Sequence, residues 1–380
     1  MRIHEYQAKQ ILEDFGVPVP PGKVVTDPDE AAEVFDSLGA GPAVIKAQSY
    51  GLAPVGARGV GLARSAEEAV ALVRNMIGKR SGIDPFRSHP VTKVLIEQYV
   101  EIESPLYLAV IMDAELAKPV MLAGDRLPPH EPGAIPTQGV TREVIDPRFG
   151  TLSFQWKKIT AALGLHRSMV AQVTAVASGL YRALIECECI AAEIGPLGLT
   201  AGRELVALEA RMRFDASALF RHDEIAGLLD PAEFSETENA LRPKWIRYVA
   251  LGGRIGCVAF DTGSALVILD ALAGTGARAG GVLYLTGRDP AEKIAYGITC
   301  LLREESFRAL VVEVPRDPDL AERVISAVGM AAGEAPTEKP VVALAVSETA
   351  RRAAAKLAER TATVQVVSSA AQAAAAARGT

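Results

Sequence analysis

The sequence predicts an α/β protein in two parts, a mixed α+β part followed by a doubly wound parallel sheet. Three observations predict this class. Helix-like and strand-like segments alternate from the start, a polar stretch with two prolines at 223–246 is typical of a domain linker, and strand–turn–helix units then repeat four times. At 380 residues, each part is long enough to bury its own core.

The first part begins with an amphipathic helix over residues 3–15, which Gly16 and three nearby prolines end. A second helix lies within "DPDEAAEVFDSLG", and "PAVIKAQ" is a buried strand. The helix "SAEEAVALVRNMIGKR" opens with Ser65 and Glu68 at the spacing of a capping box. Three strand-like segments follow, "KVLIEQYV", "PLYLAVIMD" and "KPVMLAGD". This order predicts two lobes with a cleft between them.

The proline-rich segment 125–150 is expected to be a long exposed loop that leads into helical structure from about residue 156 to 187. After it, "CIAAEIGPLGLTAGRELVALEAR" is expected to form two strands joined by a glycine-containing turn. Four strand–loop–helix units then run from "RIGCVAF" to "AAAKLAER", and an alanine-rich helix or tail ends the sequence. Parallel strands collect their loops at one edge, where such sheets bind ligands.

Composition excludes several classes of function. A formal net charge of −6 and a pI near 5.6 argue against nucleic-acid binding. No apolar run reaches the roughly 20 residues of a membrane helix, and no signal-peptide core is present. The four cysteines form no CxxC pair, which suits reduced thiols. We therefore expect a cytoplasmic protein that contacts neither nucleic acid nor membrane.

Three sets of residues are candidates for chemistry. Lys46 ends a buried strand beside the glycine-rich loop Gly51–Gly61, an arrangement that suits a phosphate but also fits an ordinary surface hairpin. Glu97 ends another strand, where it either accepts from an adenine amino group or is a strand-edge charge. Glu193 and Glu209 follow on successive strands, as a shared Mg²⁺ would need, although exposed strand glutamates are common. The five histidines form no triad, so no nucleophile is assigned.

The order of these motifs resembles the β subunit of succinyl-CoA synthetase and its relatives, the ADP-forming acid–CoA ligases, among them malate–CoA ligase. The resemblance runs essentially end to end. It is carried by "IHEYQAK", "FGVPVPPGKV", "VIKAQ", "EQYVEIESPLYLAV", "AEIGPL", "ALEARMRFDASALFRHDEI" and "GGRIGCVAF".

The resemblance implies an ATP-grasp domain over 1–240 and a flavodoxin-like ligase domain over 245–380. It also implies a partner, an α-type subunit that binds most of the CoA and carries the histidine that is phosphorylated, so no catalytic residue is expected in this chain. ATP or GTP would be bound with Mg²⁺, and the substrate would be a carboxylic acid. The expected site residues are Lys46, Gly56, Arg58, Gly59, Glu97 and Val100 for the nucleotide, Glu209 and Glu193 for the metal, and Phe260, Asp261, Gly263, Arg288 and Arg316 in the substrate-side loops.

Departures from the family pattern leave two functions open. Pro105 stands where the family has a ribose-binding glutamate, Gly195 replaces a metal-binding asparagine, and Arg211 replaces a lysine. The family's "NIFGGI" loop is "EVPRDP" here. One hypothesis is a working ligase for an altered acid, with Arg288 and Arg316 pairing with a further carboxylate. The other is a paralogue without turnover that acts as a scaffold or regulatory subunit.

Overall fold

The computed structural model describes residues 1–50, 59–81, 89–128, 136, 138–335, 338–359, 361 and 363–378. The chain divides into two compact units, the first ending at Glu233 and the second beginning at Phe234. This division lies inside the polar segment 223–246, which is built from short helical pieces rather than an extended linker: α6 Asp223–Gly227, η5 Pro231–Glu233, α7 Glu236–Leu241 and η6 Arg242–Lys244. Each unit is described by itself.

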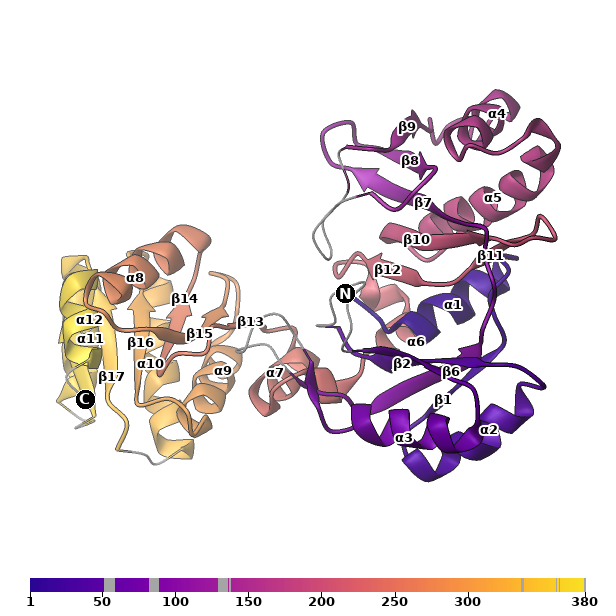
Figure 1. Ribbon diagram of the computed structural model, residues 1–380. Helices are drawn as coiled ribbons and strands as arrows, with labels where there is room; N and C mark the ends of the chain where they lie inside the picture. The colour runs from indigo at the N-terminus through magenta and orange to yellow at the C-terminus, as the bar shows by residue number, and fades with distance from the viewer. Residues whose placement is uncertain are drawn as a thin grey trace. The chain divides into compact units, whose positions relative to one another are not determined.

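The first sheet of unit 1 is antiparallel, in the order β1-β6-β2-β3. Helices α2 and α3 pack on it (Figure 1). Ser65 caps α3 as predicted by accepting from Glu68 N at 3.2 Å, but Glu68 accepts from Arg64 N rather than closing a capping box. The elements are β1 Gly22–Val25, η1 Pro28–Glu30, α2 Ala31–Ser37, β2 Ala43–Gln48, β3 Val60–Ala63, α3 Ala66–Met76 and β6 Lys93–Gln98, with a small separate pair β4 Arg80–Ser81 and β5 His89–Pro90.

The second sheet of unit 1 has the order β11-β10-β7-β8-β9, with β12 also paired to β10. Two expectations were wrong here. Segment 125–150 contains a strand, β9, and the predicted two strands after residue 189 are three, because β11 and β12 pair separately with β10. The elements are β7 Ser104–Asp113, β8 Lys118–Gly124, β9 Thr141–Val144, α4 Ser153–Ala162, η3 Arg167–Met169, α5 Val170–Glu186, β10 Cys189–Leu199, β11 Leu205–Ala207, β12 Ala210–Phe214 and η4 Leu219–Arg221.

One helical stretch of the described chain, Arg167–Glu186, has the length and apolar composition of a membrane span. Its inward face, which includes Val173, Ala177 and Leu180, packs into the core of unit 1. The stretch therefore serves as the core helix under the second sheet.

Helix α1, Glu5–Asp14, lies between the two sheets of unit 1 (Figure 1). Its buried residues are Gln7, Ala8, Lys9 and Leu12, so one face carries both apolar and polar side chains inward. The predicted helix is confirmed, and its place makes it the element that both lobes contact.

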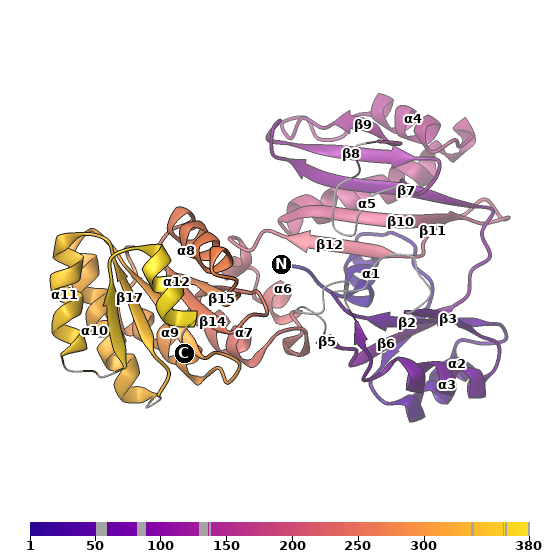
Figure 2. The same cartoon turned by 60° about the vertical axis from the view of Figure 1, so that its left-hand side comes forward.

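Unit 2 is the predicted doubly wound sheet, in the order β13-β15-β14-β16-β17-β18, with only the edge strand β13 antiparallel. Helices α9, α10 and α11 cover one face, and α8 and α12 cover the other (Figure 2). The elements are β13 Arg247–Ala250, β14 Ile255–Ala259, α8 Thr262–Gly274, β15 Ala279–Tyr284, α9 Ala291–Arg303, β16 Ala309–Val314, α10 Pro318–Glu334, β17 Val341–Ala345, α11 Glu348–Ala358, β18 Val364–Val367 and α12 Ala370–Arg378. The predicted α/β fold class is confirmed.

Candidate functional site

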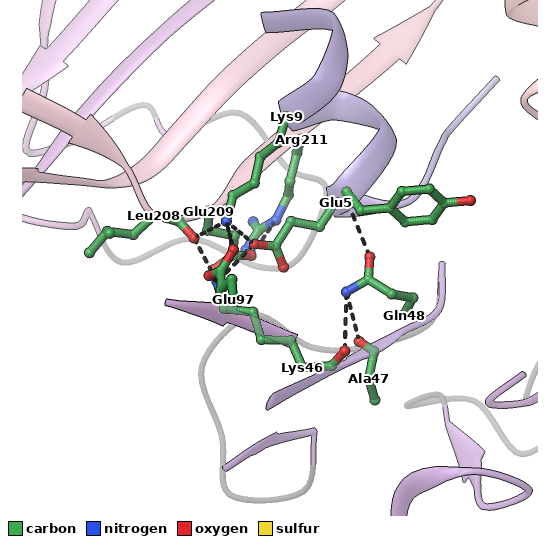
Figure 3. A network of polar contacts seen from close by, with 10 residues as sticks. Glu5, Lys9, Lys46, Ala47, Gln48, Glu97, Leu208, Glu209 and Arg211 are labelled. Carbon is green, nitrogen blue, oxygen red and sulfur yellow. Dashed lines mark hydrogen bonds and ion pairs between the residues drawn. The ribbon is translucent and has the colours of Figure 1, made fainter. Parts of the chain in front are cut away.

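Lys46 lies near the end of β2 with its ammonium group turned toward α1 (Figure 3). Its Nζ lies 2.5 Å from Glu97 Oε1 and 2.8 Å from Glu5 Oε1, and it donates to Leu208 O at 2.6 Å. Burial opposes the charged form, but Glu5 and Glu97 together raise the pKa of Lys46 above that of a free lysine. Lys46 is therefore a buried cation whose charged form its two carboxylate partners favour.

A second lysine, which the sequence analysis missed, shares the same carboxylates. Lys9 Nζ of α1 lies 2.5 Å from Glu97 Oε2 and 2.9 Å from Glu5 Oε1, and donates to Leu208 O at 2.7 Å. Glu97 is only 3% exposed, and each of its oxygens takes one lysine. Burial alone would raise the pKa of Glu5, yet Lys9 and Lys46 outweigh it and lower that pKa. The four side chains form one buried ion network between α1, β2 and β6.

Gln48 joins α1 to β2 a second time. Its Oε1 accepts from Tyr6 N at 3.2 Å, and its Nε2 donates to Lys46 O at 3.3 Å. Because Gln48 is buried, its side-chain amide finds these partners on the backbone in place of water. The "HEYQAK" and "KAQ" motifs are thus two sides of one contact, which fixes the position of Lys46 relative to the helix.

The two predicted metal ligands, Glu193 and Glu209, both contact the guanidinium of Arg211. Figure 3 shows Arg211 beside Glu209. Glu193 on β10 and Arg211 on β12 are direct cross-strand partners, 3.3 Å apart between Glu193 Oε1 and Arg211 Nη1. Arg211 Nε donates to Glu209 Oε1 at 3.0 Å, and Nη2 contacts the same oxygen. Burial raises the pKa of Glu209, although Arg211 acts against this shift. Both carboxylates therefore converge on one cation, the guanidinium of Arg211.

The glycine at position 195 fits against a tyrosine. A Cβ at Gly195 would lie 3.1 Å from Cδ2 of Tyr107, a contact that few real side chains make. Burial raises the pKa of the Tyr107 hydroxyl, and the charge and hydrogen bonding of Glu193 add to the shift. The Tyr107 ring therefore lies beside position 195, for which the resemblance implies a metal-binding asparagine.

Of the remaining nucleotide candidates, Gly59 and Val100 belong to the residues that the structure describes. Gly56 and Arg58 lie outside the described residues. Gly59 is buried, and its carbonyl accepts from Ala47 N at 2.8 Å. Val100 is half-buried two residues beyond the end of β6, and the Glu97 carboxylate faces the lysines. The structure thus brings Lys46, Glu97, Glu209 and Glu193 into one region, together with Arg211.

In unit 2, the predicted loop after β14 is bound by the carboxylate of Glu313, which we did not predict as a site residue. Asp261 caps α8 by accepting from Ser264 N at 2.8 Å. Glu313, near the end of β16, accepts from Phe260 N at 2.9 Å and from Ser264 Oγ at 2.8 Å. Burial raises the pKa of Glu313. Two carboxylates therefore face the start of α8, a position that otherwise attracts anions, and Gly263 lies in its first turn.

The two predicted substrate-side arginines lie on either side of this loop. Arg288 follows β15 and Arg316 follows β16, and both strands neighbour β14 in the sheet. Both arginines are exposed. Because the strands are parallel, the loops that carry the two arginines lie on either side of the loop after β14, at the carboxyl ends of the strands.

A further buried cluster supports the start of α1. His4 Nε2 lies 3.1 Å from Asp230 Oδ2, and Lys93 contacts the same carboxylate oxygen. Ser49 Oγ donates to Glu233 Oε2 at 3.2 Å, and Glu233 Oε1 is 3.9 Å from His4 Nε2. Burial lowers the pKa of His4 despite the neighbouring Asp230. This cluster ties the segment before the division between the units to the first helix.

The His4 cluster predicts a pH dependence of stability. The unfolded histidine takes up a proton as the pH falls below about 6.5, and the buried His4 resists it, so the free energy of unfolding of unit 1 should fall on acidification. In His4→Asn this part of the decrease should be absent. Urea unfolding at pH 7.5 and 5.5 in a Trp245→Phe background, followed by the fluorescence of the buried Trp156, measures the change in the free energy of unfolding for each protein. Equal changes in the two proteins would contradict the assignment.

The chain is similar to known proteins along most of its length. The ATP-grasp domain family matches residues 2–199. The β subunit of ADP-forming succinate–CoA ligase from Chloroflexus aurantiacus is 32% identical over 362 residues, 94% of each chain. The corresponding subunit from Anaeromyxobacter dehalogenans is 34% identical over 319 residues, 83% of this chain and 82% of that one.

A solved structure shows the same fold over nearly the whole chain. ATP citrate lyase from Methanothrix soehngenii, determined with citrate and coenzyme A, superposes with a TM-score of 0.70 at 17% identity, over 96% of this chain and 95% of that one. The predicted resemblance is thereby confirmed. With an ATP-grasp domain over more than half its length and relatives above 30% identity along most of it, the chain belongs to the family of ADP-forming succinate–CoA ligase β subunits.

Proposed function

We propose that this chain is the nucleotide-binding subunit of an ADP-forming acid–CoA ligase. It binds ATP in unit 1, and the phosphoryl group passes to a histidine of an α-type partner subunit, which also binds most of the CoA. A di- or tricarboxylic acid then becomes the acyl-CoA. The observation that carries the proposal is the charged Lys46, buried between the two sheets of an ATP-grasp domain and held by Glu97.

Lys46 is the proposed phosphate ligand. Its ammonium has three donors, and Glu97, Glu5 and Leu208 O engage all three. A phosphate oxygen must therefore replace one of these partners. Glu97 is the most enclosed of them, so we expect the phosphate to replace Glu5 or the Leu208 carbonyl. Gly56, Arg58, Gly59 and Val100 complete the proposed nucleotide site.

The family uses ATP with Mg²⁺. Glu209 and Glu193 would hold the ion here, since both carboxylates already converge on one cation. Bound there, Mg²⁺ would neutralise phosphate charge. On the acid side, Arg288 and Arg316 are the proposed partners of substrate carboxylates, because they border the loop from Phe260 to Gly263 at one edge of the sheet.

A scaffold or regulatory subunit without turnover is the second candidate. Glu313 favours it, because this carboxylate and Asp261 already satisfy the start of α8 and would repel an incoming phosphate. Gly195 also favours it, because it offers the metal no side chain. ATP binding separates the two candidates at the first step.

Calorimetric titration with ATP and Mg²⁺, on the chain alone and with a co-expressed α-type subunit, is the test. Binding, followed by ADP release that needs CoA and one acid of a di- and tricarboxylate panel, supports the ligase. Absence of ATP binding in both states supports the scaffold.

Lys46→Ala is expected to weaken ATP binding by about ten- to a hundredfold, the value of one hydrogen bond to a charged group. The same titration measures it. Lys23→Ala is the matched control, because Lys23 is an exposed lysine on β1 of the same sheet. An unchanged affinity of Lys46→Ala for ATP would show that Lys46 is not part of the nucleotide site.

A further inference from the structure

The Arg211 guanidinium already holds one oxygen of each carboxylate that would bind a divalent ion, Glu193 Oε1 and Glu209 Oε1. Arg211 contacts Glu209 Oε1 through two nitrogens and Glu193 Oε1 through a third. A metal ion that binds these carboxylates meets a guanidinium already bonded to them. The positively charged guanidinium repels a metal ion bound to the same carboxylates, and the Oε1 atom of each is already engaged.

The backbone holds Arg211 in this place. Glu193 and Arg211 face each other across the paired strands β10 and β12, and Glu209 lies two residues before Arg211 on the same segment. The arginine side chain is 30% exposed, against 16% for Glu193 and 24% for Glu209. Water thus reaches the guanidinium, so it can leave the carboxylates without first unfolding a strand.

The surroundings supply no additional ligand that would favour a metal over the arginine. Gly195 has no side chain, and the Tyr107 ring stands beside it. Within the described part of the chain, no group of three or more His, Cys, Asp or Glu side chains is placed to hold a metal ion. The site has two carboxylates and its own cation.

We propose that Arg211 is a built-in competitor of the divalent ion. While no nucleotide is bound, it neutralises Glu193 and Glu209, and the metal binds to them only as the guanidinium leaves. The metal ion therefore binds together with the nucleotide phosphates and not before them. This inference deepens the proposed function and rests on it for its role in the reaction, but it concerns metal binding by the free chain.

Titration of the full chain with Mn²⁺ alone, followed by electron paramagnetic resonance of the free ion, tests the proposal. Arg211→Gln removes the competing cation, and we expect Mn²⁺ to bind at least about tenfold more tightly than to the wild type, since each charge-assisted hydrogen bond is worth roughly that factor. The double variant Arg211→Gln/Glu209→Gln should lose this gain. Arg182→Gln is the matched control, because it also removes one arginine from a glutamate, Glu186, in the same unit.

Wild-type affinity for Mn²⁺ equal to that of Arg211→Gln would overturn the proposal. So would a gain that persists in the double variant or appears in Arg182→Gln. Circular dichroism confirms that each variant is folded. Because no nucleotide is present, a chain that fails to bind ATP but gains Mn²⁺ affinity in Arg211→Gln would contradict the proposed function and support this inference.

Discussion

Glu97→Gln is expected to lower the free energy of unfolding of unit 1 by about 3–5 kcal/mol, the range for breaking a buried ion pair from one side. The carboxylate is 3% exposed and binds Lys9 and Lys46 at 2.5 Å each. A neutral amide leaves two buried ammonium groups with Glu5 as their remaining carboxylate. Urea unfolding followed through Trp156, in a Trp245→Phe background, measures the loss in unit 1 because Trp245 belongs to unit 2.

Two controls make the Glu97 result specific. Glu101→Gln removes the same charge at an exposed position shortly after β6 and should change stability by less than about 0.5 kcal/mol. The double variant Lys9→Met/Glu97→Gln should recover part of the lost free energy of unfolding, because it removes one of the two buried ammonium groups that Glu97→Gln alone leaves without this carboxylate. A loss below about 1 kcal/mol in Glu97→Gln would mean that water reaches the lysines, against the burial described above.

Gly253→Ala is expected to lower the free energy of unfolding of unit 2 by about 3 kcal/mol, the upper end of the range for inserting an extra carbon into a well-packed region. An added Cβ would lie 2.2 Å from Arg278 O and 2.5 Å from Ala279 O. These are backbone atoms, and Gly253 N already donates to Ala279 O at 3.0 Å, so the two segments cannot move apart without losing this bond. Hydrogen exchange measured on peptides from β14 and β15 should rise, while peptides from unit 1 stay unchanged.

Gly274→Ala is the matched control for the second unit. It lies at the end of α8 with nothing within 4 Å of an added Cβ. Alanine restricts the unfolded chain and favours helix, so this variant should be neutral or more stable by up to about 1 kcal/mol. Equal exchange in the two variants would show that the Gly253 backbone can relax.

Most helices and strands could be predicted from the sequence, because the spacing of their apolar residues follows the period of a helix or a strand. Buried apolar runs and helical periods repeat regularly in unit 2, and α1 is amphipathic. Strand β9 escaped prediction since its residues are mostly exposed, and only its pairing with β8 makes it a strand. Short edge strands carry little apolar pattern.

The polar partners within the site were much harder to predict. Glu5 and Lys9 are spaced i, i+4, which in most helices marks an exposed pair, whereas here both meet the buried Glu97 and Lys46 network. The bond between Arg211 and Glu193 depends on the register of β10 against β12, which hydrophobic pattern alone leaves open. Glu313 did leave a signal, a carboxylate inside the apolar run "ALVVEV".

The bond from Lys9 to the Leu208 carbonyl spans 199 positions of the chain. Contacts of such length form late, since a long loop must close before they bring any stabilisation. During synthesis Lys9, Lys46 and Glu97 all emerge well before residue 208. Their charged groups are therefore hydrated until the Leu208 carbonyl is available to both lysines. A ribosome-bound fragment that stops before β11 should therefore form most of the first sheet but lack the carbonyl to which both lysines donate.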